Sequence, residues 1–136
     1  MNYDVIRKLL DTQLQTVVGL PTLYTENNSI EVDGRGAFCR STLLNSEPMP
    51  LTVGPNGNNQ YKGLYQVDLF YPQDNGTTTQ NALAGLVIDA FPRSLILNDA
   101  TTGLNVHVDM SWQLTAYTVQ QNYYVVPISV RWSSYA

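Results

Sequence analysis

Charged residues are scarce in this chain of 136 residues. They make up 13% of the sequence, about half the share of a typical domain, whereas the hydrophobic share of 43% is ordinary. Asn, Gln, Ser, Thr and Tyr stand where charges are missing, and burying an amide or a hydroxyl costs far less than burying an ion. Such a surface suits extensive contact between subunits, although drift in composition would give the same numbers.

Cysteine and histidine are almost absent, because Cys39 and His107 are the single examples of each. One cysteine cannot form a disulfide within the chain, and nothing in the composition indicates an oxidising compartment. No apolar run approaches the length of a membrane span, and the N-terminal stretch, amphipathic and of mixed charge, is unlike a signal peptide. We therefore expect no association with a membrane.

Basic residues are also few. Lys and Arg number 7 against 11 Asp and Glu, which leaves a net charge of −4 at pH 7. The seven cations are scattered along the chain and form no basic stripe of the kind that a DNA-binding protein needs. Specific binding of nucleic acid is therefore not expected.

The spacing of apolar residues predicts two helices and six strands. One helix is expected over residues 3–17 with Asn2 as its N-cap, and a second over residues 77–91 with a Thr N-cap. The second helix should face the core with Leu83, Leu86, Val87, Ala90 and Phe91. Strands are expected over residues 22–28, 37–44, 64–71, 95–97, 103–114 and 123–132.

This order, α-β-β-β-α-β-β-β, predicts a single α+β domain over residues 1–136. We expect a mostly antiparallel sheet with the two helices packed on it. Pro127 lies inside the last predicted strand, and proline there indicates an edge strand or a bulge.

The segment from residue 45 to 63 is long and irregular, with several prolines, glycines and asparagines. Loops of this length tend to be functional or mobile. Met49, Leu51 and Val53 alternate within it, and Asn56-Gly57 suits a tight reversal. We therefore expect a loop or a protruding arm with an apolar edge.

The strand over residues 103–114 raises the question of a catalytic surface. Its alternation should place Leu104, Val106, Val108, Met110, Trp112 and Leu114 on one face, and Asn105, His107, Asp109, Ser111 and Gln113 on the other. A serine, a histidine and an aspartate thus share the polar face. Alternate residues on one strand face are about 6.7 Å apart, however, and a nucleophile must come within about 3 Å of its base. This row therefore predicts no catalytic triad.

Other chemical sites are equally unsupported. A zinc site would have to combine His107 and Cys39 with carboxylates, without any closely spaced ligand pair. The run "GPNGNN" lacks the lysine and the following helix of a phosphate-binding loop. Glu31 and Asp33 alone are a weak signal for acid–base chemistry or calcium. We expect no enzyme activity, no metal and no cofactor.

Several stretches resemble the tail terminator proteins of long-tailed bacteriophages and prophages, which are minor tail proteins. These are the helix "YDVIRKLL", the stretch "LPTLYTENN" leading into a strand, the strand "GLYQVDLFYP", the helix "TTTQNALAGLVIDAF" and the closing "YYVVPISVRWSS". The resemblance covers essentially the whole chain and depends on the order, spacing and total length of these features. None of the stretches is a catalytic signature.

The resemblance implies a structural virion protein. Family members are small α+β proteins that form a hexameric ring at the head-proximal end of the tail tube. The implied partners are further copies of the chain, the tail tube protein and the head–tail connector, with DNA passing through the lumen unbound. Six copies at −4 give −24 at pH 7, so we expect acidic side chains to prevail in the lumen. The implied location is the virion tail at its head-proximal end, after assembly in the host cytoplasm.

Two groups of residues are candidate contacts with other subunits or with the tube. The first group lies in the irregular segment and comprises Met49, Leu51, Val53 and Asn56. The second is the polar row Asn105, His107, Asp109, Ser111 and Gln113, a candidate contact or lumen face. An arginine at Ser111 should then impair assembly and leave the monomer folded.

Two alternatives remain open at this point. The chain could be another ring-forming component of the neck or tail, which the sequence does not separate from a terminator. It could also be a small bacterial ligand-binding module with a groove beside Trp112 and Trp132. Both tryptophans fall on apolar faces, where they are more often core residues than ligand platforms.

Overall fold

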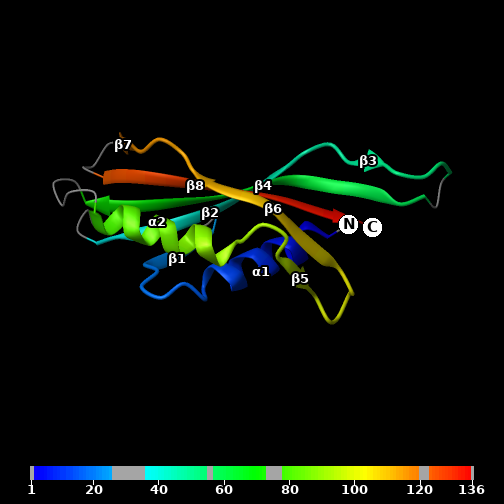
Figure 1. Cartoon of the computed structure of the whole chain (residues 1–136), viewed down its shortest axis with the longest axis horizontal. Coiled ribbons are helices and arrows are strands. Elements are labelled where there is room, and N and C mark those ends of the chain that lie inside the picture. Colours follow the sequence, from blue (N-terminus) through cyan, green and yellow to red (C-terminus); the bar gives the residue numbers. More distant parts are fainter. Residues whose placement is uncertain (1, 26–35, 55–56, 73–77, 120–122, 136) are drawn as a thin grey trace.

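A computed structural model describes residues 2–25, 36–54, 57–72, 78–119 and 123–135. In this part of the chain, eight strands form one sheet and two helices pack on one of its faces (Figure 1). Along the chain the elements are α1 (Tyr3–Leu14), β1 (Thr22–Thr25), β2 (Phe38–Asn45), β3 (Met49–Pro50), β4 (Asn59–Pro72), α2 (Thr78–Ala90), β5 (Ile96–Asn98), β6 (Asn105–Gln113), β7 (Tyr117–Val119) and β8 (Tyr123–Tyr135).

The sheet is mixed and has more strands than the sequence predicted. Its strand order is β1-β2-β4-β8-β6-β5, while β3 pairs with β4 and β7 pairs with β8. Strands β1 and β2 run parallel, and the remaining neighbours are antiparallel. The expected α+β class and the two packed helices are confirmed. The expected count of six strands is wrong, because β3 and β7 are only two and three residues long and carry no readable alternation.

Helix α1 begins where the sequence predicted and ends three residues earlier. The side-chain oxygen of Asn2 accepts a hydrogen bond from the backbone N–H of Asp4, which satisfies one free donor at the helix start. Ile6, Leu10 and Leu14 form the buried face, which fits their helical spacing of four residues. Beyond Leu14 the chain turns away, and Gly19 then adopts a positive φ of 85°.

Helix α2 buries Leu83, Ala84 and Val87, and Phe91 follows it into the core. The expectation that Leu86 faces the core is wrong, since this side chain is 49% exposed. At about 100° per residue, Leu86 lies roughly 120° from the centre of the buried stripe. Gln80 occupies that stripe instead and is 1% exposed. The threonine at position 77, the predicted N-cap, lies outside the described residues.

The main core lies between the helices and the central strands. Tyr65, Val67 and Leu69, which alternate along β4, pack with the alternate residues of β8. The inward residues of β8 are Val126, Ile128, Val130 and Trp132, with Tyr124 packed at the margin. We call this side of the sheet the helix side.

Pro127 lies in a central strand, so the expectation of an edge strand or a bulge is wrong. It pairs with Asp68 in β4, and its carbonyl accepts a hydrogen bond from Leu114 N at 2.9 Å on the other side. The N and O atoms of a strand residue point the same way, so the missing N–H faces the gap between β6 and β7. Proline is tolerated there because the β4–β8 ladder loses no hydrogen bond.

In the described part of the chain no helix covers the opposite side of the sheet, which we call the helix-free face. At one end of it, Phe38, Phe70, Tyr123 and Val125 form a buried aromatic cluster. The rings of Phe38 and Phe70 stack with centroids 4.4 Å apart. The other end, toward β3, carries exposed side chains and is the part of the face that could meet a partner.

Candidate contact surfaces

A β-bulge divides β6 into two halves. From one half to the other, the alternation of side chains between the two faces of the sheet is reversed. The register with β8 shifts between Val108 and Met110, so Asp109 is the extra residue. Val106 and Val108 lie in the core before the bulge. After it, Met110 pairs with Arg131 and Trp112 pairs with Ser129, and both partners lie on the helix-free face. One inserted residue reverses every later side chain, so the alternation predicted for residues 103–114 fails at its middle.

The predicted polar row therefore does not share one face. Ser111 pairs with the inward Val130, and its hydroxyl donates to the carbonyls of Ile88 and Phe91 at 3.3 and 3.0 Å. These carbonyls lie at the end of α2, where helical partners run out. The side-chain amide of Gln113 likewise donates to Asn81 of α2 at 3.3 Å. Ser111 and Gln113 thus contact α2 and hold it on the sheet, although Gln113 stays exposed.

The other three members of the row stay near the C-terminal end of β8. His107 meets the ring of Tyr135 edge-on at 5.6 Å. The Ser133 hydroxyl donates to Asp109 Oδ1 at 3.3 Å, and the carbonyl of Asn105 accepts from the Ser134 hydroxyl at 2.6 Å. Ser111 faces the helix side, whereas His107 pairs with Ser133 on the helix-free face. The side chains of Ser111 and His107 therefore point to opposite faces of the sheet.

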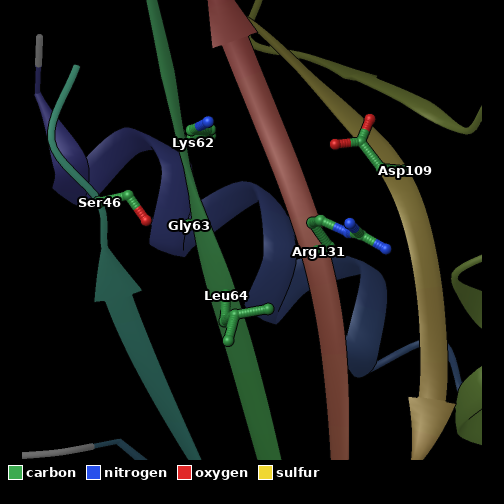
Figure 2. Close-up of a pocket in the computed structure, with 6 residues that line it drawn as sticks. All are labelled: Ser46, Lys62, Gly63, Leu64, Asp109 and Arg131. Atoms are coloured by element: carbon green, nitrogen blue, oxygen red, sulfur yellow. The ribbon is translucent and has the colours of Figure 1, made fainter. Parts of the chain in front are cut away.

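A shallow groove of about 220 Å³ crosses the helix-free face near the end of β2. It is lined by Ser46, Lys62, Gly63, Leu64, Asp109 and Arg131 (Figure 2). In Figure 2, α1 lies behind the sheet, while Lys62 and Leu64 come from β4, Arg131 from β8 and Asp109 from β6. The groove thus brings two cations and one carboxylate together on strands that are far apart in the sequence.

Two of the three cations on the helix-free face, Arg40 and Arg131, have aromatic or acidic neighbours. The Arg131 guanidinium lies 5.7 Å from the ring centre of Trp112, within cation–π range. Arg40 lies 5.5 Å from the ring centre of Phe70 and 3.6 Å from the carboxylate of Asp68. Among the described residues, Lys62 has no ion pair. Arg40, Lys62 and Arg131 therefore give a local basic excess on a chain whose net charge is −4.

The segment from 45 to 63 is more ordered than an irregular loop. Strand β4 already begins at Asn59, and Met49–Pro50 pairs with Asn59–Gln60. Beyond this ladder, Leu51 N donates to the carbonyl of Asn58 at 2.8 Å, so the chain forms a hairpin. We call the described residues of this hairpin, 49–54 and 57–60, the arm. Met49, Leu51 and Val53 are exposed along it as expected, and Asn56 lies outside the described residues.

A second exposed apolar set was missed by the sequence analysis. Met110, Leu114 and Tyr117 are exposed on β6, β7 and the connection between them, and we call these three the far strip. The alternation had placed Met110 and Leu114 on the inward face, and Asp109 gave no sign of a bulge. The same inversion separates the tryptophans, because Trp132 is buried in the core and Trp112 lies on the helix-free face. No groove can therefore lie beside both, as the ligand-binding alternative required.

The described residues contain no cluster of three or more His, Cys, Asp or Glu side chains that could hold a metal ion. Cys39 is buried with its thiol 3.5 Å from the carbonyl of Pro21, and burial raises its pKa to about 12. A thiol with so high a pKa is unreactive at neutral pH. Neither α1 nor α2 reaches the length and apolarity that a membrane-spanning helix needs.

Comparison with known protein families shows the family to which this α+β domain belongs. A model of the phage tail terminator protein family matches residues 5–132, which is nearly the whole chain. The chain belongs to this family. It is thus a structural protein of a phage tail and a component of the virion, and the family is not one of enzymes.

Solved structures share the fold of this family member. One chain superposes with a TM-score of 0.76 and 19% sequence identity, and the match covers 98% of this chain and 96% of that one. A chain from the virion of a native gene transfer agent particle gives a TM-score of 0.54 and 14% identity, with coverage of 96% and 94%. At such low identities these likenesses concern the fold alone. A search of curated proteins found no match.

Proposed function

We propose that this protein is the terminator of a long phage tail. In this role a ring of copies, six by resemblance to the family, caps the head-proximal end of the tail tube. The ring stops polymerisation of the tube and offers its other side to the head–tail connector. The observation that carries the proposal is the family match over residues 5–132, which leaves no large part of the chain for another activity.

The surface chemistry supports a role in assembly. Both helices pack on one side of the sheet, and the opposite side keeps exposed apolar residues at its β3 end. With 13% charged residues, the chain can bury much of its surface without removing many ions from water. A ring subunit needs this property, because each copy contacts two neighbours and the tube as well.

The charge distribution also bears on the lumen. Six copies at −4 give a ring charge of −24 at pH 7, and like charge keeps passing DNA from adhering to the wall. The helix-free face carries Arg40, Lys62 and Arg131 against Asp68 and Asp109. This local basic excess fits a contact with another protein better than a wall that faces DNA.

The test is to remove the protein from a phage or prophage that encodes it and to examine the particles by electron microscopy. A terminator predicts tubes of excessive length that fail to join heads, with normal tails restored by the wild-type gene. Tails of normal length that fail to join heads would indicate a neck component instead. Loss of tubes altogether would indicate a tube component, and normal infectious particles would contradict the proposal.

A further inference from the structure

The arm projects beyond the strands that flank it. The last residue of β2, Asn45, pairs with Gly63, and Tyr135 near the end of β8 pairs with Gln60. Nearer the tip, hydrogen bonds of the described residues join the arm to itself, from Gly57 N to the carbonyl of Gly54 and from Asn58 N to the Thr52 side-chain hydroxyl. Figure 1 shows this hairpin as an extension at one end of the molecule.

The arm has an exposed apolar edge and carries no charge. The sequence contains no charged residue between Glu47 and Lys62. Met49 is 45% exposed, Leu51 is 47% exposed and Val53 is fully exposed. A two-stranded hairpin is marginally stable by itself in water, and an apolar extension of this kind marks an interaction site. The arm therefore suits a partner surface that offers exposed apolar side chains.

The far strip is such a surface. The sequence contains no charged residue between Asp109 and Arg131. Within that run Met110 is 50% exposed, Leu114 is 39% exposed and Tyr117 is 44% exposed. Met110 pairs with Arg131 and Tyr117 with Val125, so the strip spans six residue steps along β8, or about 20 Å. The arm from Met49 to Val53 spans about 13 Å and fits within that length.

The arm cannot cover the far strip of its own chain. Strands β4 and β8 separate β3 from β6 and β7 in the sheet, and Figure 1 places β3 and β7 at opposite ends of the molecule. The strip runs from Met110, which pairs with Arg131, to Tyr117 in β7 at the end remote from β3, so the arm and the strip suit a head-to-tail contact between identical copies. Such a contact repeats from copy to copy and closes into a ring when the rotation permits.

We propose that the arm of one copy docks on the far strip of the next copy. The inference rests on the proposed ring and names the surfaces that would build it. Its chemistry favours a second copy, because two chains at −4 repel each other and approach most cheaply through surfaces without charge. The apolar side chains that would meet carry no charge themselves, so their burial costs little, and Arg131, which pairs with Met110, lies beside the strip.

Cysteine cross-linking tests this contact directly. A chain with both Val53→Cys and Tyr117→Cys should form disulfide-linked dimers and higher multimers when the assembled protein is mildly oxidised. The native Cys39 is buried and contributes little background. The matched control pairs Val18→Cys with Tyr117→Cys, because Val18 is 85% exposed and lies after α1, outside both surfaces. The control should give no more multimer than the wild-type chain.

Mixing two defective variants tests the direction of the contact. Val53→Asp removes the arm surface and Tyr117→Asp removes the far strip, and each should weaken self-association at least about tenfold because a carboxylate would be buried unpaired. Mixed together, they should form heterodimers, since one intact arm and one intact strip remain. Circular dichroism checks that both variants are folded. A Tyr117→Asp variant that assembles like the wild type would overturn the proposal.

Different results would contradict the docking of the arm and the proposed function. A wild-type ring without the cross-link between positions 53 and 117 would overturn the docking and leave the proposed function intact. That result would also arise if the arm contacted only the tube. A wild-type protein that forms no ring, alone or on tubes, would contradict the proposed function and the docking together.

Discussion

The hydroxyl of Tyr65 donates a hydrogen bond to the carboxylate of Asp11, which ties helix α1 to the central strand β4. Tyr65 is fully buried, and its pKa is raised well above the ordinary value, first by burial and then by the neighbouring Asp11. The pair therefore fixes the position of α1 over the sheet. Helix α1 packs on the helix side of the sheet, so the pair joins the helix to the face that it covers.

We predict that Tyr65→Phe lowers the free energy of unfolding by about 1–3 kcal/mol, the range for losing a buried hydrogen bond to a charged group. The ring remains to fill the core, so the change isolates the hydroxyl. Tyr117→Phe is the matched control, since Tyr117 is 44% exposed, and it should change stability by less than about 0.5 kcal/mol. Urea unfolding at pH 7 measures both. Equal effects of the two substitutions would contradict the role assigned to the Tyr65–Asp11 pair.

Stability should fall at alkaline pH. Burial raises the pKa of the Cys39 thiol from 9.0 to about 12, and the pKa of Tyr65 is also raised. In the unfolded chain these groups lose their protons first, so the unfolded state binds fewer protons as pH rises above about 9. The stabilisation is complete below the unfolded pKa values and is lost as pH rises toward the folded ones. Urea unfolding between pH 7 and 11 should show this decline, with a smaller slope in Cys39→Ala. An identical slope would contradict the assignment to Cys39.

Two glycines should respond oppositely to alanine. A Cβ atom at Gly63 would lie 2.0 Å from the carbonyl oxygen of Leu44 and 3.0 Å from the Trp132 side chain. Gly63→Ala should therefore cost more than about 3 kcal/mol, as overpacking against backbone does. A Cβ at Gly85, within α2, would meet nothing within 4 Å, so Gly85→Ala should stabilise by about 0.5–1 kcal/mol through helix propensity. Thermal melts of the two variants should shift in opposite directions.

Substitution of Ser111 tests the bulge in β6. The sequence placed it on an outer face, where Ser111→Arg would block assembly of a folded monomer. The structure instead predicts that Ser111→Arg destabilises the fold by several kcal/mol, since the side chain must separate β6 from α2. Met110→Arg is the neighbouring control on the helix-free face and should change stability by less than about 0.5 kcal/mol. A stable, folded Ser111→Arg monomer would contradict the observed register.

Hydrogen exchange tests the arm separately from its partner. The amides of Leu51, Gly57 and Asn58 should exchange fast in the free protein, because this part of the hairpin lies beyond the sheet. The amides of β4 from Tyr65 to Leu69 should exchange slowly, since they are paired on both sides. In the assembled ring the arm amides should become slow as well. Strong protection of the arm in the free monomer would mean that it needs no partner.

The long central strands could be predicted from sequence because one of their faces is buried along its whole length. Tyr65, Val67 and Leu69 in β4, like Val126, Ile128 and Val130 in β8, alternate without interruption and face the helices. Helix α1 was equally clear from the spacing of Ile6 and Leu10. These elements fix the fold class and the side on which the helices pack.

The contact surfaces could not be predicted in the same way. A bulge at Asp109 changes the facing of Met110 and Ser111 without any change in residue type, so alternation alone gives the wrong face. Strands β3 and β7 are too short to show a period. The basic groove joins Lys62, Asp109 and Arg131 from three strands, a proximity that only the strand order reveals.

The central claim is that this protein caps a tail tube, and the growth of tubes in its presence tests it most directly. Purified tail tube protein from the same phage would be polymerised with increasing amounts of this chain, and tube lengths would be measured by electron microscopy. The account predicts tubes that shorten as the ratio rises, each with a single ring at one end. Tubes of unchanged length, or protein distributed along their whole length, would contradict it.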